Sequence, residues 1–149
     1  MAGAGEIVRE PYLVIHKDPS SFKDVYGGAG DNIALECMRI YPAGTTAESV
    51  VIFSHPIGGG AFLPLVSALA RGGQHVIYAN TRYRGNDTAL IMEKCAADFG
   101  ACIEHARSRL GYKRVILGGW SGGGSLSLFY QDQAERPTIT HTPAGDPYD

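Results

Sequence analysis

The stretch that decides the fold is residues 114–125, which read RVILGGWSGGGS. Its first four residues, RVIL, form a short apolar run with β-branched side chains, as expected of a strand buried in a sheet. The glycines that follow predict a sharp turn over residues 118–124, and residues 125–135 have the composition of a helix. The stretch therefore predicts a strand, a tight turn and a helix in direct succession, with Ser121 inside the turn.

Within this turn, residues 119–123 have the spacing G-x-S-x-G, which is typical of a serine held on a strained strand-to-helix turn. Such a turn keeps the hydroxyl clear of the sheet, so Ser121 is the candidate nucleophile. Side chains two positions before and after it would collide with the neighbouring strand and helix, which explains Gly119 and Gly123. The backbone N–H of Gly122, at the start of the helix, is predicted to face a developing oxyanion.

Other interpretations of the same turn fit parts of the pattern. A glycine-rich turn in which Ser121 is only a structural or capping residue requires no chemistry at all. A phosphate-binding loop has its outer glycine spacing at Gly118 and Gly123, but Gly124 stands where the lysine is required. A dinucleotide-binding turn is only approximated, because no G-x-G-x-x-G begins there. A nucleotide binder is therefore the least favoured interpretation.

Around this stretch, short apolar runs alternate with helical patterns. That alternation predicts an α/β fold, with a mostly parallel sheet and helices on both faces. The first two strands are expected to form an antiparallel edge. The predicted strands are residues 12–16, 32–41, 49–54, 75–79 and 114–117; the predicted helices are 61–71, a long one from a cap at Asp87 or Thr88 to about Leu110, and 125–135.

A second glycine-rich loop, HPIGGG at residues 55–60, directly follows the apolar run SVVIFS. Glycines there allow the backbone to approach a bound molecule closely. Pro56 has no N–H, so Ile57 is the predicted second oxyanion donor, with Gly58 the next choice. His55 is interpreted as a structural loop histidine rather than a general base, because the general base that serves a nucleophile on a strand-to-helix turn usually follows it along the chain.

Composition excludes several classes of protein. With 149 residues, 44% hydrophobic and 19% charged, the chain has room for about one domain with a packed core. A net charge of −2 offers no basic surplus, so a nucleic-acid partner is disfavoured. No apolar run approaches the length of a membrane span, and the N-terminal residues MAGAGEIVRE have no apolar segment like that of a signal peptide. Three unpaired cysteines, Cys37, Cys95 and Cys102, suit a reducing compartment. A cytoplasmic location is expected.

Three motifs occur in a telling order: HPIGGG after the third predicted strand, TRYRGND after the fourth and GWSGG after the fifth. With them the chain resembles the α/β-hydrolase superfamily over roughly residues 30–135. The resemblance implies a serine hydrolase that acts on an ester, thioester or amide without a cofactor or metal. It makes Ser121 the nucleophile and the N–H groups of Gly122 and Ile57 the oxyanion hole. It also implies that Arg84 and Gly85 are structural.

The chain departs from that superfamily after the nucleophile, where an acid and then a histidine should follow later strands. His141, with Asp132, Asp146 and Asp149, stands in the wrong order and too close to the preceding helix. We therefore expect residues 1–149 to form one incomplete domain: a strand and loop to residue 30, a core over 31–135 and a loop tail over 136–149. A second chain or a missing C-terminal segment would supply the acid and the histidine. The alternative is an inactive truncated fragment, or a half-domain with a role in assembly.

The last predicted strand carries a further expectation. In the superfamily it pairs with another strand, so residues 115–117 would here form an open apolar edge. We expect such a chain to associate with copies of itself or with a partner that supplies the missing strands.

Overall fold

The computed structural model describes residues 5–18, 30–86 and 90–137. In order along the chain they form β1 (Ile7–Lys17), β2 (Asn32–Pro42), β3 (Ser49–His55), α1 (Pro64–Arg71), β4 (Val76–Asn80), α2 (Met92–Ser108), β5 (Arg114–Gly118) and α3 (Gly122–Glu135). The alternation of strands and helices predicted from the sequence is confirmed.

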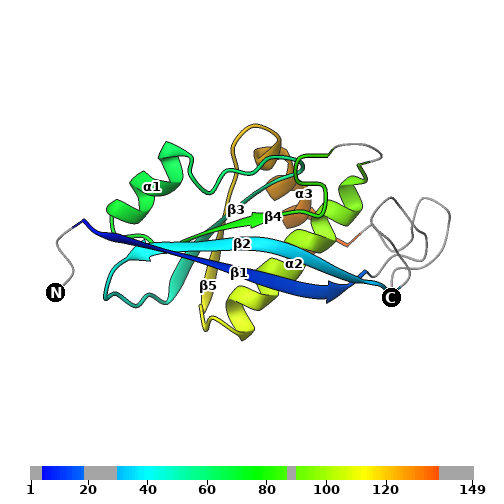
Figure 1. Ribbon diagram of the computed structural model, residues 1–149. Coiled ribbons are helices and arrows are strands. Elements are labelled where there is room, and N and C mark those ends of the chain that lie inside the picture. The colour runs from blue at the N-terminus through cyan, green and yellow to red at the C-terminus, as the bar shows by residue number, and fades with distance from the viewer. Residues whose placement is uncertain (1–4, 19–29, 87–89, 138–149) are drawn as a thin grey trace.

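The strands form one sheet in the order β1-β2-β4-β3-β5 (Figure 1). β1 pairs with β2, and β2 with β4, in antiparallel fashion, whereas β3 is parallel to both β4 and β5. The expected antiparallel edge is therefore present. Because β3 connects to β4 on one side and β5 returns on the other, the direction of winding reverses at β3.

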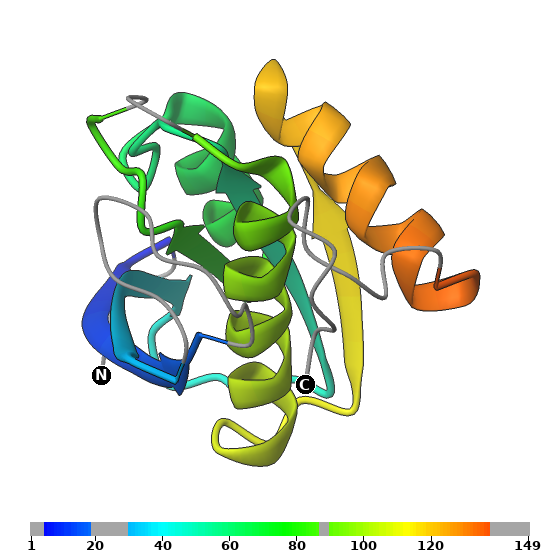
Figure 2. The same cartoon turned by 90° about the vertical axis from the view of Figure 1, so that its right-hand side faces the viewer.

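Helices cover both faces of the sheet, as Figures 1 and 2 show for α1 on one side and for α2 with α3 on the other. Successive side chains of a strand point to opposite faces. In β4, Ile77 and Ala79 pack in the cluster with α2, whereas Val76 and Tyr78 pack in the cluster with α1. This burial on both faces explains why the central strands are continuously apolar.

The long helix buries the apolar stripe that its spacing predicts. Cys95, Phe99, Cys102, Ile103 and Ala106 are all buried against the sheet. The helix begins at Met92 and has no side-chain cap, whereas the predicted caps Asp87 and Thr88 lie outside the described residues. So do most of the loop expected between the first two strands and the tail from residue 138, with His141, Asp146 and Asp149.

The boundaries of α1 and β1 differ from the predicted ones for local reasons. α1 begins at Pro64 instead of residue 61, because Leu63 donates its N–H to the Gly60 carbonyl at 3.0 Å and forms a turn before the helix. β1 is longer than the predicted residues 12–16 and contains Pro11. A proline without an N–H is tolerated there because β1 lies at the edge of the sheet.

At the opposite edge, β5 has no strand on its outer side among residues 5–18, 30–86 and 90–137. Its Ile116 side chain is 48% exposed, and Leu128 of the adjacent α3 is 75% exposed. The open apolar edge expected from the sequence is therefore a feature of the described fold. No helix within the described ranges is long and apolar enough to cross a bilayer.

Candidate active site

The reversal of winding at β3 creates the position where a site is expected. The loop after β3 leads to α1 on one face, whereas the loop after β5 leads to α3 on the other face. In open α/β sheets, ligands bind outside the carboxyl ends of the strands at such a switch point. Both glycine-rich loops of the sequence thus meet at one place.

Ser121 occupies the turn between β5 and α3. Its backbone has φ 54° and ψ −126°, and it is the only residue other than glycine with positive φ in the described part of the chain. A non-glycine residue in this conformation is strained, and such strain concentrates at functional sites. The side chain of Ser121 is exposed.

The flanking glycines are required by backbone contacts on both sides. A Cβ at Gly119 would lie 2.4 Å from the carbonyl carbon of Gly123, and a Cβ at Gly123 would lie 2.2 Å from the carbonyl oxygen of Ser54. Both separations are far below contact distance, so neither position accepts a side chain. The sequence argument for these two glycines is confirmed.

α3 begins at Gly122, directly after the serine, rather than at Ser125 as predicted. The turn is so tight that Gly123 donates its N–H to the Trp120 carbonyl at 2.9 Å, and Gly124 donates to the Ser121 carbonyl at 3.0 Å. Within the described ranges the N–H of Gly122 has no acceptor. An unpaired amide at a helix N-terminus beside an exposed hydroxyl is suited to stabilise negative charge.

The second loop is held by its carbonyl groups. Thr81 Oγ1 donates to the Pro56 carbonyl at 2.6 Å, the N–H of Gly85 donates to the Ile57 carbonyl at 2.9 Å, and Tyr78 Oη donates to the Gly58 carbonyl at 2.8 Å. All three donors come from β4 or from the loop after it. The path of the HPIGGG loop is therefore set by its neighbour.

The amides of this loop meet His55. Its Nδ1 accepts the N–H of Gly58 at 2.9 Å and, less favourably, the N–H of Ile57 at 3.2 Å. The predicted oxyanion donor Ile57 thus has an intramolecular acceptor in this structure. His55 itself is the last residue of β3, so the acceptor stands where the strand passes into the loop.

The loop after β4 is anchored by a cluster of buried charges. Arg82 donates to both carboxylate oxygens of Asp98, through Nε to Oδ2 at 3.0 Å and through Nη2 to Oδ1 at 2.8 Å, and also pairs with Asp18. Lys94 Nζ donates to Asp18 at 3.1 Å. Burial opposes the charge on Arg82, but the hydrogen bonds and charges of the two aspartates outweigh it and raise the pKa of Arg82.

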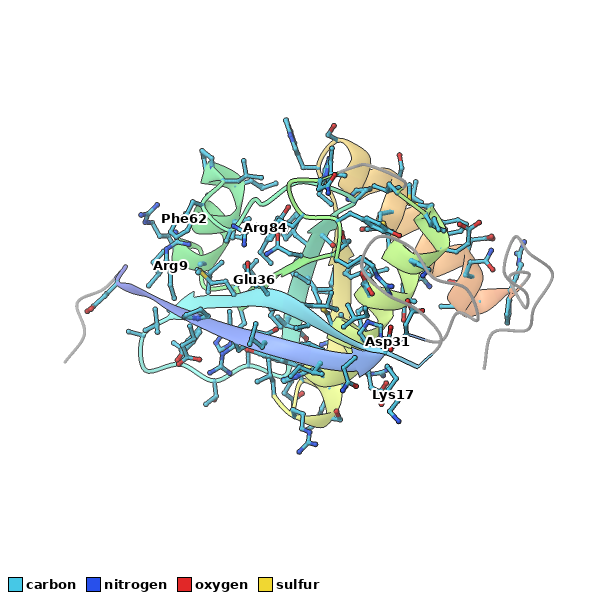
Figure 3. All side chains as sticks on the ribbon, turned by 45° about the vertical axis from the view of Figure 1, so that its right-hand side comes forward. Arg9, Lys17, Asp31, Glu36, Phe62 and Arg84 are labelled. Carbon is cyan, nitrogen blue, oxygen red and sulfur yellow. The ribbon has the colours of Figure 1, made fainter. Side chains whose placement is uncertain are left out.

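Sequence reasoning missed this cluster. A signal was present, because Lys94 and Asp98 stand four residues apart inside the apolar stripe of the long helix, where charged side chains are unexpected unless paired. By contrast, Arg84 of the same loop pairs with Glu36 at the surface, as Figure 3 shows.

A cavity of about 260 Å³ lies between the two glycine-rich loops. Ser121, His55 and the glycines 58–60 line one part of it, and the rest is mainly apolar. Trp120 lines this cavity, whereas Phe62 lines a neighbouring cavity of about 630 Å³ that shares Gly59, Gly60 and Leu63 with it. The nucleophile candidate and the oxyanion loop therefore face one common space.

The described histidines other than His55 have positions away from this cavity. His16 pairs with Asp98, His75 contacts Tyr112 and Thr45, and His105 stacks on Tyr12. Residues 5–18, 30–86 and 90–137 thus provide no separate histidine beside Ser121.

No family model matches the chain, and neither does any curated protein. Solved structures do match. Ferulic acid esterase from Streptomyces cinnamoneus has a TM-score of 0.62 at 13% identity over 91% of this chain and 58% of its own. Acetyl xylan esterase from Paenibacillus sp. R4 has 0.58 at 15% over 89% and 52%, and brefeldin A esterase, a bacterial homologue of human hormone-sensitive lipase, has 0.54 at 21% over 87% and 36%.

These proteins have the α/β-hydrolase fold, and so does this chain. The resemblance inferred from the three sequence motifs is confirmed at the level of the fold. The chain spans roughly half the length of the structures that it matches.

Proposed function

We propose that this chain carries the nucleophile and oxyanion-binding part of a serine hydrolase that acts on an ester, thioester or amide. The observation that supports this most directly is the strained, exposed Ser121 beside the unpaired N–H of Gly122. A turn that only connects a strand to a helix has no need of a non-glycine residue at positive φ. The neighbouring structures are esterases, which agrees with this chemistry.

In the proposed reaction, Ser121 Oγ attacks the acyl carbon while a general base takes its proton, and the carbonyl π electrons move onto oxygen. The N–H of Gly122 and a second donor from the HPIGGG loop stabilise that oxyanion. Collapse of the intermediate releases the protonated alcohol, thiol or amine and leaves an acyl-serine. Water then attacks this acyl group by the same steps and releases the acid.

The acyl group is expected to be apolar and of modest size. The cavity beside Ser121 has Leu63, Leu65, Val66 and Trp120 in its lining and a volume of about 260 Å³. A charged acyl chain would lose its hydration there without a partner of opposite charge.

We further propose that the histidine and the acid come from polypeptide outside residues 1–149. No described histidine other than His55 lies at the cavity, and the Nδ1 of His55 already accepts two amides. His141 lies outside the described residues, and it precedes Asp146, the reverse of the order expected for the acid and the histidine. A positioned base contributes about 10²–10⁴-fold to such reactions. Residues 1–149 alone should therefore turn over little substrate.

A fluorophosphonate probe tests this proposal. We expect weak labelling of residues 1–149 alone and strong labelling once the C-terminal polypeptide that completes the domain is added. Ser121→Ala should abolish the labelling, whereas Ser125→Ala, an exposed serine of the same helix, should leave it unchanged. Equal labelling with and without the added polypeptide would contradict the missing base, and labelling that survives Ser121→Ala would contradict the nucleophile.

The second candidate function is that of a catalytically inactive half-domain with a role in assembly. The exposed Ile116 and the outer side of β5, which no strand of the described residues covers, favour it, because such an edge is suited to pair with a strand. Failure of Ser121 to react in the completed domain, together with stable association through β5, is the result that this candidate predicts.

A further inference from the structure

The imidazole of His55 reaches from the end of β3 to the start of α3. A Cβ placed on Gly122 would lie 3.0 Å from His55 Nε2 and 3.4 Å from Cε1, so the ring edge lies against the residue that follows Ser121. His55 and Ser121 also line the same cavity. The ring therefore stands between the two glycine-rich loops.

The hydrogen bonds of His55 determine which nitrogen carries its proton. Nδ1 accepts the N–H groups of Ile57 and Gly58, and a nitrogen that accepts an N–H cannot itself carry a proton. The ring proton is then on Nε2, which becomes a hydrogen-bond donor. Within the described residues this Nε2 has no acceptor.

The two donors are close enough to share one oxygen. Because Cβ lies roughly 2.5 Å from the N of the same residue, His55 Nε2 and the N–H nitrogen of Gly122 are at most about 5.5 Å apart. An oxyanion accepts hydrogen bonds of about 2.7–3.1 Å, so donors at that separation can both reach it.

We propose that His55 is a catalytic residue of this site and that its Nε2–H is the second oxyanion donor, paired with the N–H of Gly122. The inference rests on the proposed acyl transfer at Ser121. It replaces the Ile57 amide as second donor, because the structure directs that amide to His55 Nδ1. One side chain thereby holds the loop through Nδ1 and stabilises the intermediate through Nε2.

Two substitutions separate these roles. In His55→Asn, the side-chain oxygen can take the place of Nδ1 as acceptor for the loop amides, but no donor reaches the position of Nε2. His55→Ala removes both functions. We expect fluorophosphonate labelling of Ser121 in the completed domain to slow about 10²–10³-fold in both variants, as for loss of one oxyanion donor. The thermal midpoint of His55→Asn should stay close to that of the unsubstituted protein.

If His55→Asn reacts as fast as the unsubstituted protein while His55→Ala is slow, the histidine only positions the loop and the donor is one of the amides of residues 57–60. That result would overturn the inference and leave the proposed function intact. If the completed, unsubstituted domain is not labelled at all, the proposed function itself fails, and with it this role of His55.

Nitrogen NMR of residues 1–149 with labelled histidine gives a readout that does not depend on labelling. We expect the His55 ring to carry its proton on Nε2. A proton on Nδ1 would contradict the hydrogen bonds to Ile57 and Gly58 and overturn the inference. In the phosphonylated domain, the Nε2–H signal should shift and exchange more slowly with water, whereas an unchanged signal would exclude a bond to the adduct.

Discussion

The loops after β4 and β5 lie at the same carboxyl end of the parallel strands, but their polar groups differ in whether they have partners within the chain. After β4, Arg82 is buried and forms ion pairs with Asp18 and Asp98. After β5, Ser121 is exposed on a strained backbone and the neighbouring amide of Gly122 has no acceptor in the described chain. In the loop after β4 the charged side chain of Arg82 has partners within the chain, whereas in the loop after β5 the hydroxyl and the amide remain free to contact a substrate.

The difference shows how a reactive turn is supported. The loop after β4 supplies the donors Thr81 and Gly85 to the carbonyls of Pro56 and Ile57, and so determines the path of the HPIGGG loop that faces Ser121. Groups that are to meet a substrate must lack internal partners, so their geometry has to be imposed by neighbours that have them. The first two of four predictions, ordered from the largest expected effect to the smallest, test this division directly.

The buried ion cluster should dominate stability. Asp98→Asn leaves Arg82 buried without its bidentate partner, so we expect a loss of about 3–5 kcal/mol in the free energy of unfolding, measured with denaturant. Glu36→Gln is the matched control, because it breaks the exposed pair with Arg84 and should cost at most about 1 kcal/mol. Similar losses in the two variants would remove the contrast between buried and surface charges.

The first turn of α3 offers a matched pair of glycines. Gly123→Ala places a Cβ 2.2 Å from the Ser54 carbonyl oxygen, so we expect a loss of about 1–3 kcal/mol and displacement of the turn. Gly124→Ala meets nothing within 4 Å and lies in the helix, so it should stabilise by up to about 1 kcal/mol. Thermal melts of both variants measure this, and a tolerated Gly123→Ala would contradict the tight contact between α3 and β3.

The open strand should affect association more than folding. Ile116→Lys adds a charge to the exposed side chain of β5, so we expect less self-association in sedimentation velocity and a change in stability within about 0.5 kcal/mol. A chain that is already a monodisperse monomer before substitution would count against the expected role of this edge.

The smallest expected effect is a dependence of stability on pH. It comes from His75, which lies at the amino end of β4, away from the loops after β4 and β5. Burial, with a contribution from Arg39, lowers the pKa of His75 below its ordinary value. The unfolded chain therefore takes up the proton first, so stability should fall as the pH drops below about 6.5 and level off below the folded pKa. His75→Gln should flatten this dependence in unfolding curves between pH 8 and 5, although burial likewise lowers the pKa of His105, whose share would remain.

Much of the architecture could be predicted because it depends on local patterns. The apolar runs of the central strands reflect burial on both faces, and the stripe on the long helix reflects its single buried face. The need for glycine at positions 119 and 123 could be predicted for a similar reason, since a side chain at either position would clash with the backbone in any strand-turn-helix this tight.

Boundaries and partners could not be predicted in the same way. The start of α3 at Gly122 depends on how closely its first turn packs against the end of β3, which no local pattern encodes. The pairing of Arg82 with Asp18 and Asp98 joins three segments that are distant in the sequence. The acceptor role of His55 Nδ1 depends on the path that the β4 loop imposes on its neighbour.

The sequence by itself determined the alternating α/β order, the two glycine-rich loops and the serine within the second of them, because these follow from periodicity, glycine spacing and chain direction. Only the tertiary structure decided which amides remain unpaired, which nitrogen of His55 carries its proton and which charges are buried together. Those properties depend on contacts between segments far apart along the chain. Such contacts form only when the sheet brings the carboxyl ends of its parallel strands together.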